Sequence, residues 1–332
     1  MTRPLLGHDE AVAAFRDALD SGRLPHAWLI AGQQGIGKAL FADKAAMRTL
    51  AQGTGQLDAP GLEVPGDHPV AHLVGAGSHP DMMRLERLPR ETGEGLARSI
   101  KVDQVRGLHR LFSTTTSLSP WRVVVIDSAD ELERGSSDAG NALLKLLEEP
   151  PPSTLFLLVS HAPDQLLPTI RSRCRLLRLA PLADDVMTSA LEAALPDADA
   201  TEIAALVAIG EGAPGRAIAF RGLDIGGLDA AMRALAEQGD PTNARRSALA
   251  HILSLKAAQP RYEAFLARAP AMIARQARVR RGPALAEALG LWERASALAG
   301  NARRLSLDPN STVFELCGLI AALAATESSR AA

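Results

Sequence analysis

The first half of the chain alternates continuously apolar segments with segments that are apolar on one helical face. Short apolar runs, which predict buried strands, occur at residues 28–31, 82–87, 122–127, 154–160 and 175–179. Helical periodicity occurs at residues 39–51, 102–112 and 137–149. Strands that alternate with helices in this way predict a parallel sheet with helices on both faces.

Beyond Pro181 the strand patterns stop, and alanine-rich helical segments follow one another to the end. The α/β domain is therefore assigned to residues 1–180, a small helical domain to 181–221 and a larger helical domain to 228–332. The glycine-rich segment 222–227 separates the two helical domains. Residues 52–80, rich in Gly, Pro, Asp and His, are expected to form an irregular excursion from the α/β domain.

The composition is that of an ordinary soluble globular protein, with 47% apolar and 22% charged residues. A formal net charge of −2 argues against a protein that binds nucleic acid with its whole surface. No apolar run approaches the roughly 20 residues needed to cross a bilayer. Cys174 and Cys317 lie far apart and form no disulfide framework, so a cytoplasmic location is expected.

Basic residues gather in two short segments of the chain. A solvated surface is the simpler interpretation of such clusters, but the second one leaves open a DNA-binding adaptor whose affinity falls steeply with salt. The clusters are Arg171, Arg173, Arg175 and Arg178, and Arg275, Arg278, Arg280 and Arg281.

A glycine-rich turn follows the first predicted strand. Residues 32–38 (GQQGIGK) stand between a strand and a helix, which is the context that a phosphate-binding loop requires. The glycines Gly32, Gly35 and Gly37 let backbone N–H groups close around phosphate oxygens. Lys38 would reach the outer phosphates. A glycine-rich turn without chemical use is the alternative.

Two positions needed for ATP hydrolysis carry unsuitable residues. A Ser or Thr should follow the lysine and place its hydroxyl on Mg²⁺, but Ala39 stands there. Asp127 would supply the second half of the metal site, yet the acid expected beside it, which polarises the attacking water, is replaced by Ser128. A positioned general base contributes about 10²–10⁴ in rate. ATP or ADP could bind here, but hydrolysis is not expected.

Several segments resemble bacterial clamp-loader proteins of the AAA+ family. The matching segments, in the order found in that family, are PHAWLI at 25–30, GSHPD at 77–81, IKVDQVR at 100–106, NALLKLLEEPP at 141–151 and Ser-Arg-Cys at 172–174. They cover about residues 20–180. The resemblance implies a RecA-like AAA+ P-loop domain, followed by a small helical lid and an all-α collar domain that joins a loader ring.

The resemblance also implies roles for individual residues. Arg173, in the Ser-Arg-Cys segment, would be presented in trans as an arginine finger to ATP in a neighbouring motor subunit. Ser160 stands where relatives carry a polar sensor for the γ-phosphate, and Arg216 resembles the second sensor arginine of the lid. The alternatives are a surface ion pair for Arg173, a strand-end hydrogen-bonding group for Ser160 and a surface helix start for Arg216.

Within this family, Ala39 and Ser128 favour the non-motor delta-prime (stator) type over the ATP-hydrolysing tau/gamma motor type, which is the alternative function. The resemblance implies membership of a DNA-directed DNA polymerase (nucleotidyltransferase) holoenzyme at the replisome. The implied partners are the motor (tau/gamma) and delta subunits, the sliding clamp, and primer-template DNA reached through the complex. No membrane contact is expected.

Relatives often carry four zinc-binding cysteines between the first helix and the GSHPD segment. Residues 52–78 of this chain contain no cysteine. His68 and His72 are four residues apart, with Asp67 and His79 nearby, and such side chains can hold zinc. Solvated histidines are the simpler interpretation, so neither zinc nor another metal is expected.

Overall fold

The computed structural model forms two compact units, Met1–Ala219 and Phe220–Ala332. It describes residues 4–55, 57–90, 95–113, 115–132 and 139–328. The start of the predicted α/β domain (residues 1–3) and the end of the predicted C-terminal domain (residues 329–332) therefore lie outside the described part. The predicted lid, 181–221, falls within the first unit except for its last two residues. The division into three domains stays a prediction.

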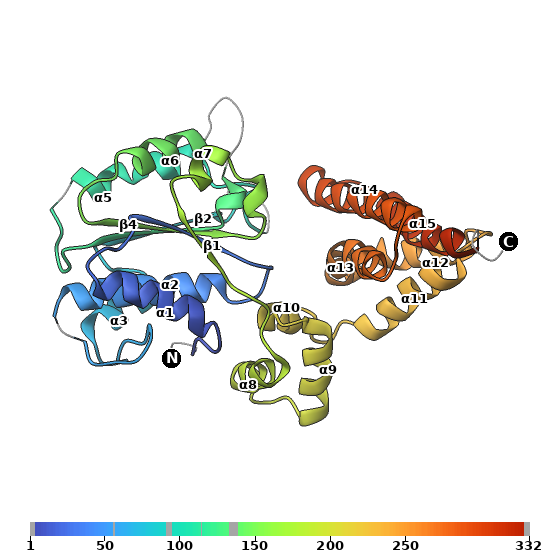
Figure 1. Cartoon of the computed structure of the whole chain (residues 1–332), viewed down its shortest axis with the longest axis horizontal. Helices are drawn as coiled ribbons and strands as arrows, with labels where there is room; N and C mark the ends of the chain where they lie inside the picture. The colour runs from blue at the N-terminus through green and yellow to red at the C-terminus, as the bar shows by residue number, and fades with distance from the viewer. Residues whose placement is uncertain (1–3, 56, 91–94, 114, 133–138, 329–332) are drawn as a thin grey trace. The chain divides into compact units, whose positions relative to one another are not determined.

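A parallel sheet forms the centre of the first unit (Figure 1). Its strand order is β2-β3-β4-β1-β5, so β1 lies between β4 and β5. The strands are β1 (Ala27–Ala31), β2 (Met82–Glu86), β3 (Arg122–Asp127), β4 (Thr154–Ser160) and β5 (Arg175–Arg178). All five predicted strands are confirmed, and no boundary differs from the prediction by more than one residue.

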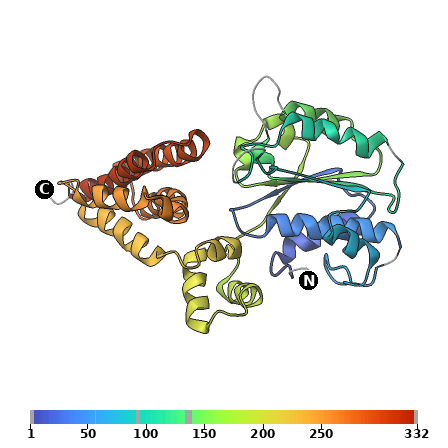
Figure 2. The same ribbon diagram turned by 180° about the vertical axis from the view of Figure 1, so that it is seen from behind.

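Successive side chains of the central strands point to opposite faces of the sheet. In β1, Trp28 and Ile30 pack into the core on one face, and Ala27 and Leu29 pack into the core on the other. The two helical layers are visible from both sides of the molecule (Figures 1 and 2). One layer contains α1 (Asp9–Asp20), α2 (Lys38–Gly53) and α3 (Pro69–Gly75), and the other α4 (Val102–Gly107), α5 (His109–Ser113), α6 (Ala139–Glu148) and α7 (Pro168–Arg171). The predicted fold class is confirmed.

Helix boundaries differ from the sequence prediction in two places. The excursion expected to be irregular contains α3, which begins after His68, whose Nδ1 accepts a hydrogen bond from the backbone N of Val70. This helix is too short to produce a periodic pattern. The helix predicted at 102–112 is divided into α4 and α5 around Leu108, directly after Gly107, a residue type that costs about 1 kcal/mol in a helix interior. The predicted start of α6, at 137, lies outside the described residues.

A buried arginine holds the excursion against α2. Arg48 is only 1% exposed. Its Nη1 donates hydrogen bonds to the carbonyl oxygens of Ala59 and Glu63, both at 3.0 Å, and its Nη2 donates to the carbonyl oxygen of Leu57 at 3.1 Å. Lys44, also in α2, pairs with the carboxylate of Glu63. These contacts give the excursion a fixed attachment to α2.

Asp81, the last residue of the GSHPD segment, organises the loop that precedes β3. Its buried carboxylate accepts hydrogen bonds from the backbone N–H groups of Ser117, Leu118 and Ser119 at 2.7, 2.8 and 3.0 Å. Burial alone would raise the pKa of Asp81, but the three backbone donors outweigh it and lower the pKa. The GSHPD segment, which resembles the clamp-loader family, therefore contains the residue that holds the loop before β3 in place.

Three helices with their own small core follow the sheet in the first unit. These are α8 (Asp184–Ala194), α9 (Ala200–Gly210) and α10 (Pro214–Ala219). Apolar side chains from all three meet in this core: Met187, Leu191, Leu195, Ile203, Leu206 and Ala217. We refer to residues 181–219 as the lid.

The described part of the second unit, residues 220–328, consists of helices and their connections. The helices are α11 (Ile225–Gln238), α12 (Ala244–Leu253), η3 (Lys256–Ala258), α13 (Gln259–Arg278), α14 (Pro283–Leu305) and α15 (Pro309–Ser328). Arg280 is buried and its Nη2 donates a hydrogen bond to the carbonyl oxygen of Leu323. The second basic cluster is therefore not wholly presented to solvent. Among the described residues, no helix combines the length and apolar character that crossing a membrane demands.

Candidate functional site

The glycine-rich loop lies at the carboxyl end of β1, beside the carboxyl end of β4. Parallel α/β sheets bind ligands in this position, where the strand order reverses. Gly37 precedes the first turn of α2 with a φ of 110°, a conformation that favours glycine. The predicted loop is thus placed at a helix N-terminus, where backbone N–H groups favour an anion.

Lys38 folds back onto its own loop. Its side chain is almost fully buried, and Nζ donates hydrogen bonds to the carbonyl oxygens of Gly32 and Gln33, both at 2.7 Å. Burial lowers the pKa of Lys38 from 10.5 to about 8, although the nearby carboxylates of Asp130 and Asp127 oppose that change. The ammonium group therefore has protein partners in place of phosphate oxygens.

We expect Lys38 to make the free energy of unfolding rise with pH between about 8 and 10.5. In this window the unfolded chain binds the lysine proton more strongly than the folded chain does, so raising the pH favours folding. The Lys38→Met substitution removes the contribution of Lys38 to this pH dependence of the free energy of unfolding. Urea denaturation of the full chain at several pH values from about 7 to about 10 measures it. Equal pH slopes for the two proteins would contradict the prediction.

The lid is joined to the glycine-rich loop through the backbone. The N–H of Gly215 donates a hydrogen bond of 2.8 Å to the carbonyl oxygen of Gly35, and Gln33 Nε2 donates one of 2.8 Å to the carbonyl oxygen of Glu211. A Cβ atom at Gly215 would lie 2.9 Å from the Gly35 oxygen and 3.0 Å from its Cα. Glycine is therefore required at position 215 for this close approach.

Arg216 is turned toward the end of helix α9. Its Nη2 donates hydrogen bonds of 2.7 Å to both the carbonyl oxygen of Gly210 and Oε2 of Glu211. A cation at this end of a helix is favoured by the helix dipole and by the free carbonyl groups. The sensor role of Arg216 stays a prediction, and it would require the guanidinium to leave these partners.

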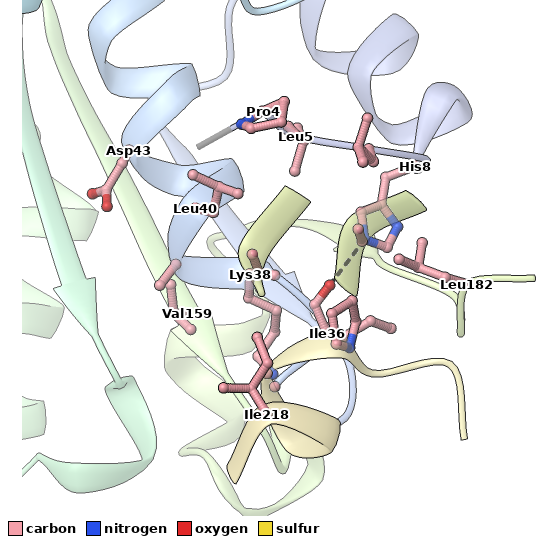
Figure 3. A pocket seen from close by; sticks show the side chains of 18 of the residues that line it. Pro4, Leu5, His8, Ile36, Lys38, Leu40, Asp43, Val159, Leu182 and Ile218 are labelled. Carbon is pink, nitrogen blue, oxygen red and sulfur yellow. Dashed lines mark hydrogen bonds between the residues drawn. The ribbon is translucent and has the colours of Figure 1, made fainter. Parts of the chain in front are cut away.

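A cavity of about 400 Å³ opens between the loop, the lid and the N-terminal segment (Figure 3). His8 closes one side, with its Nε2 3.1 Å from the carbonyl oxygen of Ile36. Such a cavity, mostly apolar with a few polar groups in its wall, has the character of a binding site for a small organic molecule. The lining includes Leu5, Leu6, Leu40, Val159, Leu182 and Ile218 and, from the predicted site, Gly35, Gly37, Lys38 and Asp127.

Asp127 ends β3, as predicted, but its carboxylate is already paired. Arg84 in β2 donates from Nη2 to Asp127 Oδ2 at 2.6 Å, from Nη1 to Asp43 in α2, and from Nε to Glu86 at 2.9 Å. The sequence analysis missed Arg84 and Asp43. A usable signal exists, because strand alternation places Arg84 on the same face as Met82, and a charge on that face needs a partner.

These residues do not fit a Mg²⁺–ATP site of the hydrolytic kind. Ala39 offers no hydroxyl, a guanidinium lies on Asp127, and the neighbouring Ser128 is buried. Over the described residues, no group of three or more His, Cys, Asp or Glu side chains could hold a metal ion. His68 and His72 accordingly do not gather with Asp67 and His79 into such a group.

Ser160 ends β4 as a fully buried side chain. Its Oγ donates a hydrogen bond of 2.8 Å to Asp130 Oδ1, and the backbone N of His161 donates one of 2.6 Å to Asp130 Oδ2. Asp130 lies in the short helix η1 (Ala129–Glu131), and its side chain reaches back to the end of β4. Ser160 thus makes a hydrogen bond at the strand end, and its role as a γ-phosphate sensor stays a prediction.

Arg173 lies between α7 and β5 and does not line the cavity. Its side chain is 34% exposed, and Nη2 is 2.6 Å from Glu148 Oε1 at the end of α6. Its Nη1 also donates to the carbonyl oxygen of Thr169 at 3.1 Å. Burial raises the pKa of the adjacent Cys174 to about 12, so this cysteine remains a packed thiol. The guanidinium is thus accessible from outside the chain, whereas its neighbour in the motif is structural.

Comparison with known proteins identifies one family. A model described as "DNA polymerase III, delta subunit" matches residues 7–183, slightly more than half of the chain. This range contains every predicted site residue except Arg216.

Individual relatives match between about half and two thirds of the chain. DNA polymerase III subunit delta' of Pseudomonas aeruginosa is 38% identical over 190 residues, which are 57% of this chain and 53% of that protein. The Escherichia coli subunit delta' is 33% identical over 212 residues, 64% of this chain and 58% of that protein. A subunit gamma of Buchnera aphidicola is 28% identical over 183 residues, 55% and 46% of the two proteins. The chain spans about half the length of the curated relatives it matches.

Proposed function

Because the chain belongs to the DNA polymerase III delta-subunit family, we propose that it is a non-motor, delta-prime-type subunit of a bacterial clamp loader. In this role it assists the ATP-driven loading of the sliding clamp onto primed DNA during replication. It contributes Arg173 as an arginine finger to ATP held by a neighbouring tau/gamma motor subunit, and it hydrolyses no ATP of its own.

The observation that carries this proposal is the state of the chain's own nucleotide cleft. The Arg84 guanidinium pairs with Asp127, and Lys38 donates to two carbonyl oxygens of its own loop. A catalytic Mg²⁺ and its hydroxyl ligand have no place in this arrangement. By contrast, Arg173 lies outside the cleft with a partly exposed guanidinium, which supports a role in another chain's site.

The proposed partners follow from the family. They are the motor (tau/gamma) and delta subunits, the sliding clamp, and primer-template DNA contacted through the complex, all in the cytoplasm at the replisome. The motor function is the second candidate, supported by the gamma relative, but the Asp127–Arg84 pair opposes it. The DNA-binding adaptor is the weakest candidate, because Arg280 of its basic cluster is buried.

We expect a loader reconstituted without this chain to lose most of its DNA- and clamp-stimulated ATP turnover, and to regain it when the chain is added. The rise should be at least about tenfold, because an arginine finger alone is worth about 10³–10⁵ in rate. Phosphate release by the isolated chain should equal that of a protein-free control. If the isolated chain turns over ATP and Lys38→Met abolishes that activity, the motor function is the correct one.

A further inference from the structure

One guanidinium links two carboxylates from different elements at the mouth of the nucleotide cleft. Arg84 contacts Asp127 at the carboxyl end of β3 and Asp43 on α2, and both carboxylates belong to residues that line the cavity. Ala39 and Asp43 are four residues apart, so they share one face of α2. The guanidinium is therefore bound one helical turn from the position whose hydroxyl would ligate a metal.

This pair of carboxylates requires a cation. Burial raises the pKa of Asp43, and the charge of Arg84 opposes that rise while the charge of Asp127 adds to it. Two carboxylates that face each other repel unless a cation lies between them. A divalent ion could in principle meet this need, and in this chain the Arg84 side chain does so.

We propose that the Arg84 guanidinium is a built-in replacement for a divalent cation, and that it keeps Mg²⁺ and Mn²⁺ out of the cleft by occupying Asp43 and Asp127. The inference rests on the part of the proposed function that gives this chain no ATP turnover of its own. It attributes the absence of ATP turnover to one residue, Arg84, which prevents the metal from binding. This effect can be measured on the isolated chain, without any partner subunit.

The geometry indicates that Arg84 excludes a divalent ion from Asp127, and that the two do not share this carboxylate. Mg²⁺ demands oxygen ligands at about 2.0–2.1 Å in near-octahedral arrangement. Oδ2 of Asp127 accepts the Arg84 Nη2 hydrogen bond at 2.6 Å, and a third acid, Glu86, fixes the same guanidinium through Nε. A divalent ion at Asp127 would therefore face a positive charge that is held in place on more than one side.

The test is Mn²⁺ binding by the full isolated chain without nucleotide, followed by the electron paramagnetic resonance signal of free Mn²⁺. Wild type should show no site that depends on Asp127. Arg84→Gln should gain such a site and bind Mn²⁺ at concentrations at least about tenfold lower than those at which wild type takes up any Mn²⁺, and adding Asp127→Asn should abolish this binding. Arg84→Lys keeps the positive charge and should exclude Mn²⁺ as wild type does.

Arg87→Gln is the matched control, because Arg87 follows the same strand and pairs with Glu131 at 2.9 Å. It should gain no site that depends on Asp127. Mn²⁺ binding by wild type that is lost in Asp127→Asn overturns the proposal, and this comparison does not depend on the folding of any Arg84 variant. A folded Arg84→Gln chain that gains no site also overturns it. The arginine finger is tested by turnover in the assembled loader, so failure of the two ideas can be told apart.

Discussion

We expect Arg173→Ala in this chain to lower the DNA- and clamp-stimulated ATP turnover of a reconstituted loader by about 10³-fold or more at the neighbouring site that Arg173 is proposed to complete. An arginine finger stabilises the negative charge that develops on the transferred phosphoryl group, and a loss of this size corresponds to about 4 kcal/mol or more of barrier. Single-turnover hydrolysis in the assembled complex is the appropriate measurement, because it separates chemistry from assembly and product release.

The ion pair between Arg173 and Glu148 is compatible with this role. A partly exposed pair is worth at most about 1 kcal/mol, so it can orient the guanidinium without preventing its transfer to a phosphate. Arg171→Ala is the matched control, because Arg171 lies two residues away, is similarly exposed and pairs with Asp164 at 2.8 Å. Its turnover should stay near wild type. If Arg173→Ala leaves turnover unchanged in an intact complex, this residue is not a finger.

Arg48→Met lowers the free energy of unfolding of the first unit by about 3 kcal/mol. The substitution keeps much of the apolar stem but removes a charged donor from the carbonyl oxygens of Leu57, Ala59 and Glu63. Hydrogen bonds to charged groups are worth about 1.5–3 kcal/mol each, and buried acceptors left unsatisfied add a further cost. Urea denaturation followed by tryptophan fluorescence and circular dichroism measures the change.

Arg16 provides the comparison for Arg48. It contacts the same excursion, donating to the carbonyl oxygen of Gly61 at 2.6 Å, but its side chain is 22% exposed and also pairs with Asp20. Water can replace its contacts, so Arg16→Met should cost only about 1 kcal/mol. Equal losses for the two variants would show that burial of Arg48 is not what makes its contacts strong.

The sheet could be predicted because its signals are local. The strands at 122–127 and 154–160 are continuous apolar runs, and a strand buried on both faces leaves no room for polar positions. The glycine-rich loop was also identifiable, since its function depends on consecutive residues. Helix α3 was not, because a helix of only seven residues held by a histidine cap is too short to show a period.

The state of the site could not be predicted, because it depends on residues brought together from distant parts of the chain. Asp43, Arg84 and Asp127 meet only when α2, β2 and β3 pack together. Ser160 was correctly placed at a strand end, but its hydrogen bond to Asp130 depends on the positions of two strand ends. In each case the residue type was visible in the sequence, and the partner was not.

The backbone contact between Gly35 and Gly215 bears on how the first unit responds to its surroundings. Where a lid touches its loop only through a bound ligand, the angle between lid and sheet changes as the ligand binds and leaves. Here the hydrogen bonds that set this angle belong to the chain itself. We therefore expect the lid to stay closed on the loop whether or not a ligand is bound. In the proposed loader, where the motor subunits change shape with each round of ATP turnover, the chain would then supply a fixed reference against which the others move.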